Sequence, residues 1–126
     1  MRAVDTNVLV RLLTRDDPKQ EAAAKAFIRG GAWLSHLVLA ESLWVLSSVY
    51  EAKPPQVAAA IAMLLEHEDL VVQDADIVSN ALAHFRAHPS LGFSDCLVLE
   101  IARKAGHLPL GTFDRGLSKL EGAQRL

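Results

Sequence analysis

The sequence predicts an α/β protein with a central parallel sheet of four to five short strands and helices on both faces, in a three-layer α/β/α arrangement. Short apolar runs alternate with longer helical patterns along the chain. Strands that are joined by helices pair in parallel and are covered on both faces. The length of 126 residues suits one packed core, so we expect a single domain over residues 1–126.

The chain begins with an expected strand over residues 2–4, which ends at Asp5. A helix should follow over residues 7–13, where leucines recur at helical spacing. Asp17–Pro18 is a typical helix start, because Asp caps helices and Pro suits the first helical position. The later elements are expected in this order: the rest of that helix to residue 28, a strand over 32–35, a helix over 37–50, a helix over 54–66, a strand over 70–73, a helix capped by Asp74 and reaching residue 88, a helix from Ser94–Asp95 to Gly106, a strand over 108–112 and an edge strand over 123–126.

Composition excludes several classes of protein. Hydrophobic residues make up 51% of the chain and charged residues 22%, as in ordinary globular proteins. We find no apolar stretch of membrane-spanning length and no signal-peptide pattern, so we expect no membrane partner. The single cysteine, Cys96, excludes an internal disulfide and suits the reducing cytoplasm. The net charge of -2 means that a polyanionic partner would need local positive charge or bound metal.

Three carboxylates follow predicted strands or begin a predicted helix. Asp5 follows the first strand, Asp114 lies just beyond the fourth, and Asp95 lies in the first turn of a helix. Parallel sheets bind ligands in the crevice beyond the carboxyl ends of their strands. Each acid also has an ordinary interpretation, as a helix cap, an anion at a helix N-terminus or a turn residue. Only their joint placement favours a site.

The fourth candidate, Glu41, lies one turn inside the helix over 37–50. It shares a helix face with Leu37, Trp44 and Val45, so we expect its carboxylate to project from a largely apolar surface. A carboxylate held there is costly unless it is paired, hydrogen-bonded or bound to metal. A plain boundary position stays open, and the helix itself could be core or an interface with another protein.

Four carboxylates in one crevice would repel each other, and divalent cations remove that conflict. Ligand sets made only of oxygen suit Mg²⁺ or Mn²⁺ rather than zinc. Two such ions, roughly 3.5–4 Å apart, can activate water and stabilise the leaving oxygen in phosphodiester hydrolysis. The four acids therefore favour a metal-dependent site.

The ordered set of motifs resembles the PIN domain family. These motifs are V-D-T-N-V-L-V around Asp5, L-A-E-S around Glu41, F-S-D-C-L-V-L-E-I-A around Asp95 and T-F-D ending at Asp114. The resemblance covers essentially the whole chain, and size and layout are similar to VapC-type toxins of toxin–antitoxin pairs. It implies an Mg²⁺- or Mn²⁺-dependent endoribonuclease in which the four acids are the catalytic and metal-binding residues.

The resemblance implies further roles and partners. Asn7 and Thr112 match polar positions that would orient metal-bound water or an acidic side chain. A cognate antitoxin, an RNA substrate, a homodimer and products with 5′-phosphate and 3′-hydroxyl ends are implied as well. Some relatives carry an extra acid one turn after the third, where this chain has Val98 and Leu99, and Glu100 points away from the face of Asp95. One or two ions therefore remain open.

Basic and histidine side chains offer weaker signals. Arg115 and Lys119, just after Asp114, are the best-placed candidates for RNA contact, followed by Arg11. Solvated surface charge is the ordinary interpretation of these three and of Arg15, Arg86, Arg103 and Lys104. His84 and His88 have zinc-binding spacing without a third ligand, and His36 is unnecessary as a base beside metal.

Other functions fit the sequence less well. A phosphotransferase of the haloacid-dehalogenase type needs an acid two residues after the first, where this chain has Asn7. A response-regulator receiver needs an acidic pair after the first strand, which is also missing. A PIN-like module that binds RNA or protein without cutting is the main alternative, and the presence of all four acids argues against it.

Overall fold

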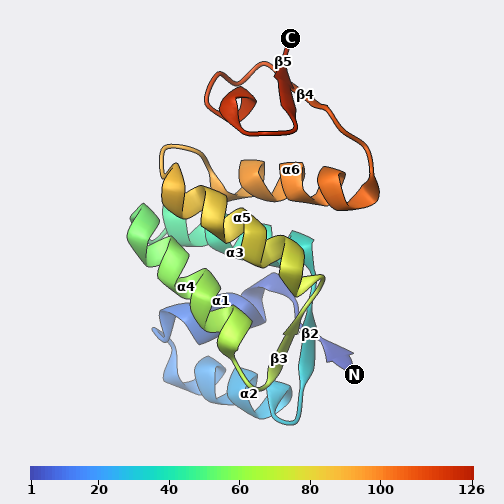
Figure 1. Cartoon of the computed structure of the whole chain (residues 1–126). Coiled ribbons are helices and arrows are strands. Elements are labelled where there is room, and N and C mark those ends of the chain that lie inside the picture. The colour runs from blue at the N-terminus through green and yellow to red at the C-terminus, as the bar shows by residue number, and fades with distance from the viewer. The chain divides into compact units, whose positions relative to one another are not determined.

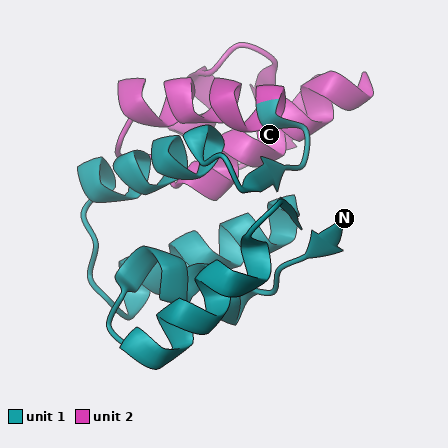
Figure 2. Ribbon diagram, turned by 90° about the horizontal axis from the view of Figure 1, so that it is seen from below, with its two compact units in different colours: residues 1–75 teal, residues 76–126 magenta.

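The computed structural model describes residues 1–126 as two compact units, residues 1–75 (unit 1) and residues 76–126 (unit 2), which Figure 2 draws in teal and magenta. Figure 1 labels the elements. Unit 1 contains β1 (Arg2–Ala3), α1 (Thr6–Thr14), α2 (Pro18–Ile28), β2 (Ala32–Leu34), α3 (His36–Ser48), α4 (Pro54–Glu66) and β3 (Leu70–Val72). Unit 2 contains α5 (Ala75–Ala87), which begins at the boundary, α6 (Phe93–Ala105), β4 (Leu110–Thr112), the 3-10 helix η1 (Leu117–Lys119) and β5 (Ala123–Arg125).

Unit 1 is built around a parallel three-stranded sheet in the order β1-β2-β3. Leu34 and Val72 are register partners on its buried face, whereas Trp33 and Val71 on the other face are 38% and 47% exposed. Helix α1 packs against α2 and α3, and α4 packs against β3. The core of this unit therefore lies on one face of the sheet, and the helices do not fully cover the other.

Unit 2 combines two helices with a separate pair of parallel strands, β4 and β5. The rings of Phe85 on α5 and Phe93 on α6 meet edge to face, with centroids 6.0 Å apart. Cys96 is fully buried in the same helix, α6. Its burial, and next the nearby charge of Asp95, raise the pKa of the thiol to about 11, so Cys96 stays protonated at neutral pH.

The predicted α/β class with parallel strands is confirmed, and each expected helix and strand is found close to its expected bounds. Asp17 caps α2 by accepting a hydrogen bond from the Gln20 N–H at 3.0 Å, and Gly106 ends α6 with a φ of 83°. The expectation of one continuous sheet is wrong, because β4 pairs with β5 and not with the first three strands. An apolar run specifies a buried strand but not its neighbour, so the sequence could not reveal this division.

None of the helices combines the length and the apolar character needed to cross a membrane.

Candidate active site

Asp5 and Glu41, the two predicted site acids of unit 1, meet at Thr6. Asp5 is the N-cap of α1, and its Oδ1 accepts a hydrogen bond from the Thr6 N–H at 2.7 Å. The Thr6 hydroxyl donates to Oε2 of Glu41 on α3 at 2.8 Å. Asp5 is therefore a helix cap, as the ordinary interpretation held, and it also lies beside a second acid. The structure brings these two acids together at the carboxyl end of β1.

Thr6 is a residue that the sequence argument missed. The sequence favoured Asn7 as the supporting polar residue, but Asn7 is exposed and forms no hydrogen bond with either acid. The available signal was position: Thr6 follows the capping acid directly, so its hydroxyl lies in the first turn of α1. Asn7 instead lines an apolar cavity of about 360 Å³ between α1 and α2, together with Val8, Arg11, Gln20, Ala23, Ala24 and Phe27.

The surroundings of Glu41 differ from the expectation. Leu37 and Trp44, which share its helix face, are 68% and 67% exposed, and Glu41 is exposed as well. Helix α3 is apolar on both sides, and the side that faces the core carries Leu39 and Leu43. Water reaches the Glu41 carboxylate, so its charge does not carry the free-energy cost of burial that the sequence led us to expect.

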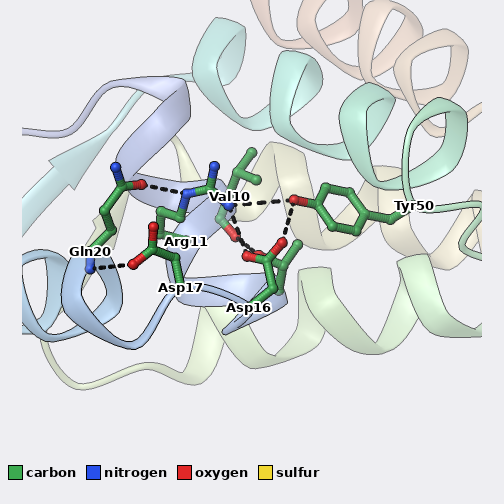
Figure 3. A network of polar contacts seen from close by, with 7 residues as sticks. Val10, Arg11, Asp16, Asp17, Gln20 and Tyr50 are labelled. Atoms are coloured by element: carbon green, nitrogen blue, oxygen red, sulfur yellow. Dashed lines mark hydrogen bonds and ion pairs between the residues drawn. The ribbon is translucent and has the colours of Figure 1, made fainter.

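Arg11 takes part in a polar network that Figure 3 shows. Its guanidinium donates to Gln20 at 2.7 Å and to Asp16 at 2.8 Å, and the Tyr50 hydroxyl donates to the other oxygen of Asp16 at 2.9 Å. Hydrogen bonds from Thr14 and Tyr50, together with the Arg11 charge, lower the pKa of Asp16. Arg11 thus joins α1 to α2 and to the segment after α3. Its contact with RNA stays a prediction.

In unit 2, Asp114 is held by backbone and hydroxyl groups. Its N–H donates to Oγ1 of Thr112, the last residue of β4, at 3.0 Å. Its Oδ1 accepts from the Leu117 N–H at 2.8 Å, at the start of η1. Asp114 is thus a turn residue whose backbone N–H is held by the Thr112 hydroxyl. That this hydroxyl orients metal-bound water or an acidic side chain stays a prediction.

Asp95 and Asp114 lie on segments that pack against each other within unit 2. A Cβ added at Gly116 would lie 2.8 Å from Leu91 Cδ2 and 3.3 Å from Asp114 Oδ1, so only glycine fits there without a shift. Leu91 leads into Gly92, where a Cβ would lie 3.6 Å from Oδ2 of the half-buried Asp95. The loop that carries Asp114 therefore contacts the segment that enters α6.

The four predicted acids share an electrostatic feature: none forms an ion pair. Asp16, Glu21, Asp76 and Glu100 each pair with a basic side chain, whereas the exposed Glu66 and Glu68, like the four predicted acids, form no ion pair. Uncompensated carboxylates supply the oxygen ligands that Mg²⁺ and Mn²⁺ prefer, so the donor set fits such an ion. Asp5 and Glu41 belong to unit 1, and Asp95 and Asp114 belong to unit 2. The structure contains no group of three or more His, Cys, Asp or Glu side chains that could hold a metal ion.

Among the other candidates, Arg115 and Lys119 are exposed and form no ion pair. Two of the candidate histidines, His36 and His84, make structural contacts. His36 Nε2 lies 2.7 Å from the Gln73 carbonyl, and its N–H donates to the Gln73 side chain at 2.9 Å, which joins α3 to the end of β3. His84 Nε2 lies 3.3 Å from Glu100 Oε2.

Comparison with known proteins assigns the chain to a family. A family model described as the PIN domain matches residues 2–123, a range that includes all four acids. None of the curated proteins matches the chain. Among solved structures, the crystal structure of VapC20 from Mycobacterium tuberculosis, described as a sarcin-ricin loop cleaving toxin, is 20% identical with a TM-score of 0.45 and covers 98% of both chains. Because the family match spans nearly the whole chain, the protein belongs to the PIN domain family.

Proposed function

We propose that this PIN domain protein is an Mg²⁺- or Mn²⁺-dependent endoribonuclease that hydrolyses RNA phosphodiester bonds as the toxin of a toxin–antitoxin pair. Asp5, Glu41, Asp95 and Asp114 are its metal ligands and catalytic acids in this proposal, with residues 1–126 working as one domain. The observation that carries the proposal is that Thr6 hydrogen-bonds to both Asp5 and Glu41 at the carboxyl end of β1, and neither acid forms an ion pair. Membership of the PIN family, whose members are typically nucleases, supports it.

The chain's own residues would prepare the acids for this task. Thr6 orients Asp5 and Glu41 through its N–H and its hydroxyl. Thr112 and the Leu117 N–H hold Asp114 from two sides. When bound, one or two divalent cations would activate a water molecule and stabilise the leaving oxygen. The exposed Arg115 and Lys119 would contact RNA phosphates beside Asp114.

A cognate antitoxin and a second copy of the chain are the proposed protein partners, and an RNA substrate implies action in the cytoplasm. Leu37 and Trp44, at 68% and 67% exposure, support a protein partner of either kind. Large apolar side chains grouped on one helix face are unusual on a protein that works alone.

The first prediction concerns metal binding. Saturating Mn²⁺ should raise the Tm of the wild type, because a ligand that binds only the folded state stabilises it. At about 100 times Kd the gain is about 2.7 kcal/mol, or roughly 10 °C for a chain of this length. Asp5→Asn and Asp95→Asn should lose the shift, whereas Glu66→Gln, at an exposed acid on α4, should keep it. An unchanged wild-type Tm would contradict the metal site.

The second prediction concerns activity. Purified wild type should cut total cellular RNA in the presence of Mg²⁺ or Mn²⁺ and leave 5′-phosphate ends, which sequencing of the products would map. Chelator should stop cutting. Asp95→Asn should lower the cleavage rate by more than roughly 100-fold, which is the loss expected at most when a residue that only supports a metal ligand is removed. Cutting that survives chelator would contradict metal-dependent chemistry. RNA binding by wild type without any cutting would favour the non-cleaving module instead.

The third prediction concerns Thr6. Thr6→Val keeps the shape of the side chain but removes the hydroxyl that donates a hydrogen bond to Glu41. The Mn²⁺ concentration for half-maximal cleavage should therefore rise about 10–100-fold. Loss of one hydrogen bond should cost only about 1 kcal/mol of stability. Thr6→Ser restores the hydroxyl and should restore the wild-type Mn²⁺ dependence. Equal Mn²⁺ dependence in Thr6→Val and wild type would show that Thr6 does not position the acids.

A further inference from the structure

The proposed site does not use Glu100, although Glu100 is the most deeply buried charged residue, at 4% exposure. Its Oε2 accepts a hydrogen bond from Arg103 Nε at 3.0 Å and lies 3.3 Å from His84 Nε2. A buried ion pair is weak evidence of stability, because apolar residues of similar size often serve as well or better. The question is therefore what else the pair of Glu100 and Arg103 does.

Arg103 extends from α6 to the C-terminal segment of unit 2. Its Nη2 donates to the Glu121 carbonyl. A Cβ added at Gly122 would lie 3.1 Å from Nη2 and 3.2 Å from Nη1, so the guanidinium lies directly against the Gly122 backbone. Gly122 has a φ of 94°, which a side chain would strain in any case. Arg103 thus holds the Glu121–Gly122 turn, and Glu100 holds the guanidinium.

This turn leads to Asp114 through the two short strands. The Gly122 carbonyl accepts from the Leu110 N–H at 2.8 Å, at the start of β4, and β5 then pairs with β4 up to Thr112. Thr112 in turn accepts from the Asp114 N–H. Strands of three residues are short for independent stability, so their position depends on such contacts.

We propose that Glu100 and Arg103 are a positioning pair that fixes the segment carrying Asp114 against α6, the helix that carries Asp95. The inference rests on the proposed function, because it assigns the pair a role in presenting Asp114 to the metal. Glu100 keeps the planar guanidinium in the orientation that reaches the turn. Neither residue is a ligand, and both act through Asp114.

The test compares variants in which the fold is retained. Arg103→Gln and Glu100→Gln break the pair but leave a polar partner unsatisfied and could unfold unit 2. The double variant Glu100→Leu/Arg103→Met removes both charges and keeps the apolar stem of residue 103, so its Tm should stay near that of wild type. Lys104→Gln is the matched control on α6, because it removes the ion pair of Lys104 with Asp76 of α5 and leaves Glu100, Arg103 and their hydrogen bonds in place.

The first measurement is amide hydrogen exchange without metal or RNA. In the double variant, exchange over residues 108–126 should be about tenfold faster than in wild type, while unit 1 and the Lys104→Gln protein should exchange as wild type does. The second is the Mn²⁺ concentration for half-maximal RNA cleavage, which should rise about 10–100-fold in the double variant alone.

A folded double variant with unchanged exchange over residues 108–126 would overturn the inference. Faster exchange with unchanged Mn²⁺ dependence would also overturn it, because the pair would then be merely structural. If the double variant does not fold, the single variants Glu100→Gln and Arg103→Gln take its place. Hydrogen exchange over residues 108–126 and the Mn²⁺ dependence of cleavage are then measured in the single variant that stays folded. A wild type that neither binds Mn²⁺ nor cuts RNA would contradict the proposed function. Hydrogen exchange in the metal-free protein would still show whether the positioning pair holds residues 108–126.

Discussion

The arrangement of unit 1 depends on the parallel register of β1, β2 and β3. Hydrogen bonds continue past the strand ends, from the Val4 N–H to Trp33 and from the Gln73 N–H to Leu34, so the three strands end at one edge. At this edge the chain leaves the buried sheet, and the residue just before each following helix reaches solvent. These connecting residues are therefore polar. Thr6 can then reach Glu41, because α1 and α3 start from neighbouring strands of this sheet.

Unit 2 achieves its arrangement by different means. Its two strands are short and separate from the main sheet, so side chains rather than a continuous ladder fix the segment after β4. The close approach of Gly116 to Leu91 and the contact of Arg103 with Gly122 both join this segment to the region of α6. Asp114 is held at two points: its backbone N–H donates to the Thr112 hydroxyl, and its carboxylate accepts from the Leu117 N–H.

Much of the fold could be predicted from local signals. The cap and proline at Asp17–Pro18 and the glycine at Gly106 define helix ends from local sequence alone. Asp5 and Asp95 also lie at helix starts that local sequence predicts. What the sequence could not supply depends on tertiary neighbours: the pairing of β4 with β5, the solvent beside Glu41 and the partner of Glu100. The sequence of α3 is apolar on two faces and does not reveal which face is buried. The sequence around Glu100 likewise does not reveal that this carboxylate pairs with Arg103.

The central claim is that Asp5, Glu41, Asp95 and Asp114 bind a shared divalent cation. The most direct measurement is anomalous X-ray diffraction from crystals of the wild type grown with Mn²⁺. We expect an anomalous peak with carboxylate oxygens from these acids at Mn²⁺–oxygen bonding distance, and its loss in crystals of Asp95→Asn. A peak ligated by other residues, or no peak in crystals that hold saturating Mn²⁺, would contradict the central claim.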